Sequence, residues 1–221
     1  MSQHFFREIE NLKKKLLTLG AVVEERIAKA LAAVVKHDMK LALEVVEGDT
    51  EIDLMEVDVE EDCLKLLALY QPVAIDLRFV VAVLKINTDL ERMADHAVNI
   101  ARRAEYLATY PNAELPAELE IMLQKAQTMV RDSLDAFVRQ DPMLARRVCT
   151  ADREVDQLNR QMHVLIQQQI RADPERVEQF IHQLSVSRQL ERVADLATNI
   201  AEDVVYTVEG EIIRHRTAVY S

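Results

Sequence analysis

The sequence predicts an all-α protein built as two tandem three-helix bundles, and three observations carry that prediction. The 221 residues include only three glycines, Gly20, Gly48 and Gly210, far fewer than the turns of a sheet protein need. Between proline-marked breaks, apolar residues recur every three or four positions, which is the period of an amphipathic helix. A twelve-residue segment returns after 100 residues, which indicates a duplicated helical unit.

Prolines and capping residues divide the chain into its expected helices. Asp38 follows the first apolar-periodic stretch and is expected to cap the second helix, and Gln71-Pro72 is expected to open the third. Asp141-Pro142 and Asp173-Pro174 each place a capping carboxylate before a proline at the first helical position, where its missing N–H costs nothing. We therefore expect six helices, at about 4–36, 39–69, 72–108, 117–140, 142–171 and 174–208.

The segment between the third and fourth helices is the expected domain boundary. It contains Pro111 and Pro116, the closest pair of prolines in the chain. The expected domains are residues 1–110 and 117–209, each a bundle of three helices, followed by a tail at 210–221.

The two halves repeat each other in sequence. Leu90–Ala101 returns as Leu190–Ala201 with nine of twelve positions identical, and Asp49–Asp53 returns as Asp152–Asp156 at an offset of 103. A period of about 100 residues is too long for a solenoid repeat, so two packed bundles related by an internal pseudo-twofold are expected. The apolar stripe of the second helix is expected to run without a break through Gly48.

Composition narrows the function classes. A formal net charge of -11 disfavours non-specific binding to nucleic acid or to an anionic membrane. The two cysteines, Cys63 and Cys149, lie far apart without a CxxC motif, and no segment has the length and apolarity of a signal peptide or a membrane span. We expect a soluble protein of the reducing cytoplasm that does not insert into the membrane.

Paired acids are the candidate functional groups. Each half carries two acid-xxx-acid pairs, and residues four apart stand one above the other on a helix face. Counted from the turn that joins their helices, the pairs of each half fall within about one helical turn of each other. They can line one shared groove, or they can point to opposite outer sides as a solvated flank paired with arginines. The candidate metal ligands are Asp49, Asp53, Glu91, Asp95, Asp152, Asp156, Glu191 and Asp195.

The ligand chemistry favours hard or borderline cations. An oxygen-rich set with no cysteine and little histidine suits Mg²⁺, Mn²⁺ or iron, and Zn²⁺ in its carboxylate mode. The flanking Asp49 and Asp152, with Asn99 and Asn199, are the weaker candidates. Glu56 and Glu60 extend the acidic line in the first half only, since their equivalents are Asn159 and His163. The two sites are therefore expected to differ in affinity or metal count.

The doubled L-E-R-[MV]-A-D-x-A-x-N-I-A and D-x-E-[IV]-D segments resemble the PhoU family of bacterial phosphate-signalling proteins over nearly the whole chain. The resemblance implies spectrin-repeat-like three-helix bundles and a cytoplasmic, non-enzymatic negative regulator of the phosphate-starvation response. It also implies a homodimer that couples the ATPase PstB of the phosphate ABC transporter to the sensor kinase PhoR. In the family the paired acids bind metal, often as multinuclear iron or zinc clusters, and they match the eight acids named above.

Two other functions remain open at this point. Helical bundles with paired acids also host carboxylate-bridged di-iron enzymes, but those use Glu-x-x-His motifs, and none of the six histidines here has an acid three positions before it. The other alternative is a structural helical scaffold that binds no metal.

Overall fold

The computed structural model describes residues 3–110 and 114–210, with the side chain of Asp49 left out. These ranges are helical throughout apart from short turns and contain no strand, so the all-α prediction is confirmed. The elements are α1 (Gln3–Lys36), α2 (Met39–Glu47), α3 (Asp49–Tyr70), α4 (Ala74–Leu107), α5 (Ala117–Arg139), α6 (Pro142–Ala172), the 3-10 turn η1 (Pro174–Arg176) and α7 (Val177–Glu209).

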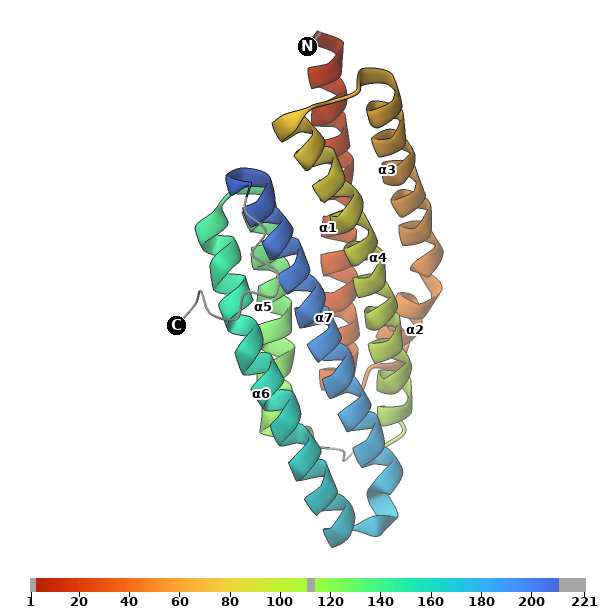
Figure 1. The fold of residues 1–221 in the computed structure, drawn as a ribbon. Helices are drawn as coiled ribbons and strands as arrows, with labels where there is room; N and C mark the ends of the chain where they lie inside the picture. The colour runs from red at the N-terminus through yellow and green to blue at the C-terminus, as the bar shows by residue number, and fades with distance from the viewer. Residues whose placement is uncertain (1–2, 111–113, 211–221) are drawn as a thin grey trace.

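The helices form two bundles that lie side by side (Figure 1). One bundle contains α1 to α4 and the other contains α5 to α7, and the bundles meet mainly where α4 packs along α7. These two helices run antiparallel, so the repeated segments Leu90–Ala101 and Leu190–Ala201 lie next to each other near the middle of the molecule. The buried side chains of both halves form one connected apolar cluster, which holds the two bundles together.

The turn between the first two helices of each half confirms the repeat in detail. The carboxylate of Asp38 accepts a hydrogen bond from the backbone N–H of Leu41 at 3.0 Å, and that of Asp141 accepts from Leu144 at 3.0 Å. The residues before them, His37 and Gln140, both adopt left-handed φ angles, of 52° and 50°. The two expected N-caps are thus observed with the same geometry at an offset of 103.

The prediction of one helix over residues 39–69 is wrong, because the structure divides this segment at Gly48 into α2 and α3. The Nη1 of Arg26 on α1 donates to the carbonyl oxygens of Glu44 at 3.3 Å and Val45 at 3.4 Å, the oxygens that an unbroken helix would direct to the backbone N–H groups of residues 48 and 49. A Cβ at position 48 would lie 1.5 Å from the same Nη1, so only glycine leaves room for the guanidinium.

Two other expected helix starts also differ. Asp173 makes no capping bond through its side chain, and η1 precedes α7, which begins at Val177. After Pro72, the chain stays extended at Val73, with φ -127° and ψ 160°, and α4 begins at Ala74. In the boundary segment, the side chain of Gln183 donates to the carbonyl of Glu114 at 2.9 Å, while 111–113, like the tail from 211 onward, lies outside the described residues.

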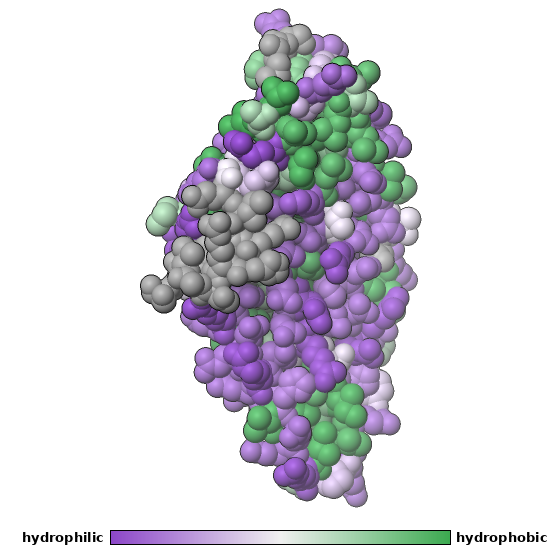
Figure 2. Space-filling model, viewed as in Figure 1, coloured by the Kyte–Doolittle hydropathy of each residue, from purple (hydrophilic) through white to green (hydrophobic). Residues whose placement is uncertain are grey.

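None of the helices in the described ranges combines the length and the apolarity needed to cross a lipid bilayer. Figure 2 shows a face that is hydrophilic across most of its middle, with hydrophobic residues gathered toward the two ends.

Candidate metal centre

The second half brings three of its predicted ligands together. Asp152 and Asp156 stand one turn apart on α6, and Asp195 faces them from α7. One carboxylate oxygen from each lies within 4.8 Å of the others, and all three residues are partly buried. The sequence had left open whether the pairs share a groove or point apart, and in this half Asp195 of one pair lies close to both acids of the other.

Electrostatics in this group favour a bound cation. Burial, together with the negative charges of Asp156, Asp195 and then Glu191, raises the pKa of Asp152 to about 6. Burial and the charge of Glu191 also raise the pKa of Asp195. Four mutually repelling carboxylates in one groove are costly when ionised, and a cation among them would remove that cost.

Protein cations neutralise the group poorly. The nearest guanidinium to Asp156 is that of Arg160, at 3.9 Å, and the nearest to Asp195 is that of Arg192, at 3.8 Å. Both arginine side chains are more than 60% exposed, at 71% and 65%, and such pairs contribute little free energy. The carboxylates therefore fit a hard or borderline metal ion better than they fit the arginines beside them.

The first half presents its acids differently. Asp53 and Asp95 are exposed, Glu91 is partly buried, and the side chain of Asp49 lies outside the described part of the structure. Among the described residues, no first-half group meets the spacing found for Asp152, Asp156 and Asp195. The first-half set therefore stays a prediction.

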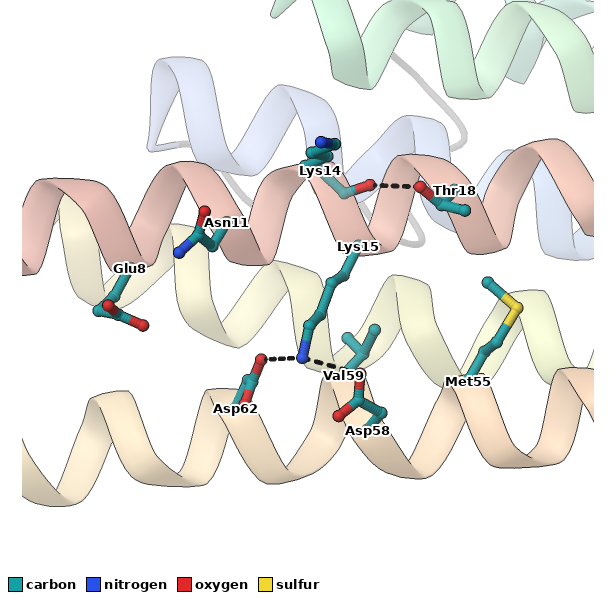
Figure 3. Close-up of a pocket in the computed structure, with 9 residues that line it drawn as sticks. All are labelled: Glu8, Asn11, Lys14, Lys15, Thr18, Met55, Asp58, Val59 and Asp62. Atoms are coloured by element: carbon teal, nitrogen blue, oxygen red, sulfur yellow. Dashed lines mark hydrogen bonds and ion pairs between the residues drawn. The ribbon is translucent and has the colours of Figure 1, made fainter.

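One of the two extra acids of the first half, Glu56, has a partner within the protein. Asn87 donates to the Oε1 of Glu56 at 3.3 Å and to its carbonyl oxygen at 2.9 Å, and burial followed by the charge of Glu60 raises the pKa of Glu56. Lys15 on α1 reaches across to Asp58, at 2.7 Å, and to Asp62 on α3 (Figure 3). The hydrogen bonds that Lys15 donates to these two carboxylates raise the pKa of Lys15, so the contact is a charge-assisted link between the two helices.

Sequence reasoning missed Lys15 because its position relative to α3 depends on how the two helices pack.

One further candidate, Asn199, lies apart from the second-half group. It lines a cavity of about 530 Å³ between α4 and α7.

Comparisons with known proteins agree with this architecture. The sequence-family model of the PhoU domain matches residues 16–104 and 119–204, one match in each half. The chain belongs to the PhoU family. It is 41% identical over 211 residues to a phosphate-specific transport system accessory protein PhoU homologue of Aquifex aeolicus, with 96% of each chain covered. A Pseudomonas aeruginosa homologue of the same description is 36% identical, over 97% of this chain and 89% of the relative.

Solved structures of PhoU share the fold. The crystal structure of PhoU from Pseudomonas aeruginosa superposes with a TM-score of 0.90 at 36% identity and covers 94% of this chain and 100% of that one. PhoU from Streptococcus pneumoniae, described as a phosphate transport system regulatory protein, gives a TM-score of 0.84 at 31% identity, covering 94% and 98%. The resemblance seen in the repeated motifs is thus confirmed, and so is the doubled helical fold.

Proposed function

We propose that this protein is a metal-binding regulatory accessory protein of phosphate-specific transport. Membership of the PhoU family supports the link to phosphate transport. The group formed by Asp152, Asp156 and Asp195, with Glu191 beside it, supports the metal and is the observation that carries the proposal. In this proposal the protein is non-enzymatic.

The second-half acids would hold the first ion. Their oxygens suit iron or zinc, with Mg²⁺ and Mn²⁺ as the other candidates, and the close spacing of several carboxylates allows more than one ion to share them. A bound ion would lock α6 to α7 at mid-height of the second bundle. The first-half acids, Asp49, Asp53, Glu91 and Asp95, would form the second and weaker site.

The regulatory part of the proposal concerns partners. We propose that the protein acts in the cytoplasm as a homodimer, restrains phosphate uptake and the starvation response, and couples the transporter ATPase PstB to the sensor kinase PhoR. The similarity to an accessory protein of phosphate-specific transport and to a regulatory protein of the phosphate transport system supports this role.

Metal analysis of purified protein tests the metal site. We expect Asp156→Asn/Asp195→Asn to lose at least half of the bound metal, because it removes the charge of two of the four carboxylates. The matched control is Asp132→Asn/Asp135→Asn, which changes two acids on α5 that pair with Arg131 and Arg139 of their own helix. Equal metal content in the wild type and both variants would overturn the metal proposal.

A deletion strain tests the regulatory role separately. We expect cells that lack this gene and any paralogue to express alkaline phosphatase in high phosphate, and the wild-type gene to restore repression. Repression that persists in the deletion strain would contradict the regulatory role while leaving the metal result intact.

A further inference from the structure

The contact between α4 and α7 has a fixed register. The Nζ of Lys85 lies 3.2 Å from the Oδ1 of Asp203 at one end, and His96 Nδ1 lies 2.7 Å from Gln189 Oε1 near the middle. At the other end the ring of Tyr106 stacks on that of His182 at 3.7 Å. We call the line of contact between α4 and α7 the seam. Because α4 and α7 are repeats of each other and run antiparallel, the pseudo-twofold relates the two ends of the seam.

One end of the seam balances its charges. This end, the mixed arm, contains Lys85, Asp89 and Arg92 from α4 and Glu202 and Asp203 from α7. Asp89 and Asp203 are buried, with 8% and 1% of their surface exposed, and Asp203 is paired with Lys85. The mixed arm therefore carries its own counter-charges.

The other end has cations where the mixed arm has acids. At the offset of 100 residues that relates α4 to α7, Glu202 and Asp203 correspond to Arg102 and Arg103. Likewise Asp89 corresponds to Gln189 and Thr88 to Arg188, while Arg92 corresponds to Arg192. We call this end the basic arm and define it by its four arginines, Arg102, Arg103, Arg188 and Arg192.

Three of the four arginines of the basic arm have no ion-pair partner among the described residues. Arg102, Arg188 and Arg192 are exposed, and within 3–110 and 114–210 neither Arg102, Arg103 nor Arg188 forms an ion pair. Arg192 has only the 3.8 Å approach to Asp195. The Nε of Arg103 is buried and has no hydrogen-bond partner among the described residues. A buried N–H without a hydrogen-bond partner costs free energy, so the Nε of Arg103 is a donor that a bound acceptor can satisfy.

The neighbouring His182 responds to this positive charge. Burial and then the charge of Arg103 lower the pKa of His182, against the charge of Glu178, which raises it. Positive charge thus reaches the end of the seam where the rings of His182 and Tyr106 stack.

We propose that the basic arm is the docking surface for an acidic segment of a partner protein. A guanidinium pairs with a carboxylate through two parallel N–H···O bonds, so an array of arginines favours carboxylates. The arginines come from two helices, and Arg188 and Arg192 stand about one helical turn apart, so several carboxylates in a row match them better than one small anion does.

The rest of the molecule makes this surface selective. The chain has a net charge of -11, so acidic segments are repelled from most of its surface and attracted only where arginines gather. The inference does not depend on a bound metal.

Fluorescence anisotropy with a labelled octaglutamate peptide tests the proposal. The protein is the full chain at low salt with EDTA present, so that metal at Asp195 cannot contribute to binding. We expect the wild type to bind the peptide and Arg102→Glu/Arg188→Glu to bind it at least about tenfold more weakly. The matched control is Arg131→Glu/Arg139→Glu, which makes the same change of net charge on α5 and is expected to bind as the wild type does.

Circular dichroism of all three proteins shows whether each is folded, which is expected since the four substituted arginines are exposed. Absence of peptide binding to the folded wild type would overturn the proposal. Equal weakening in the two double variants would also overturn it, because the effect would then follow net charge alone. Displacement of the peptide by inorganic phosphate at equal or lower concentration would replace the acidic segment with a small anion as the ligand.

Discussion

The two halves of the molecule share a sequence repeat but differ at one joint. In the first half the guanidinium of Arg26 bonds to carbonyls of α2, and the helix breaks at Gly48, directly before the acidic pair that begins at Asp49. In the second half, Met129 and Ala151 hold the equivalent positions, and α6 runs unbroken through Asp152 and Asp156. Among the described residues, the assembled group of acids lies in the half whose helix runs unbroken into the acidic pair.

The largest expected effect tests whether the cores of the halves are equivalent. Leu90 and Leu190 occupy matching positions and are both fully buried. We expect Leu90→Ala and Leu190→Ala each to lower the free energy of unfolding by about 2–5 kcal/mol, because each removes buried methyl groups and leaves a cavity. Urea denaturation of metal-free protein measures both. A loss below about 1 kcal/mol in either variant would show that the two cores are packed differently.

The next effect concerns the broken helix. We expect Arg26→Met to cost about 1–2 kcal/mol, because two carbonyls of α2 lose their donor. Gly48→Ala is also expected to destabilise, since its Cβ must displace the guanidinium. The double variant has the residue types that the second half has at the equivalent positions. Its loss of unfolding free energy is expected to be smaller than the sum of the losses in the two single variants, because alanine can then continue the helix. Additive costs in a double-mutant cycle would contradict this account of the break.

The smallest effect concerns the charge of Asp152 without metal. Its pKa in the folded protein, about 6, lies above the ordinary value of 3.8, so the ionised carboxylate disfavours folding. The loss of folding free energy caused by ionising Asp152 is absent below about pH 4, grows between pH 4 and 6, and is constant at higher pH. Solvent screening limits this loss to about 1 kcal/mol. We expect Asp152→Asn to raise the melting temperature of metal-free protein at pH 7 and to leave it unchanged at pH 4.

Metal is expected to reverse the sign of that effect. With saturating metal at pH 7, the wild type is expected to be more stable than Asp152→Asn, because the ion binds the folded state. The matched control is Asp53→Asn in the first half. The side chain of Asp53 is exposed, so little change in the melting temperature of metal-free protein is expected. A lower melting temperature for metal-free Asp152→Asn at pH 7 would contradict the repulsion among the second-half acids.

Much of this structure follows from local sequence, and the remainder depends on packing. Asp38 and Asp141 were predictable as caps because a carboxylate before a helix bonds its first N–H groups wherever the chain turns. The break at Gly48 was not predictable, because a glycine within an apolar period can lie inside a helix or end it, and the position of Arg26 beside it depends on packing. The acid spacing predicted which residues share a helix face, but which helices face each other depends on how the bundle packs.

In the proposed function, the second half of the molecule holds the preformed metal site. Anomalous diffraction from crystals grown with one molar equivalent of Mn²⁺ tests it most directly. We predict a peak among Asp152, Asp156, Glu191 and Asp195 that is stronger than any peak among Asp49, Asp53, Glu91 and Asp95. Peaks of equal height at the two sites, a stronger peak in the first half, or no peak at either site would contradict the claim.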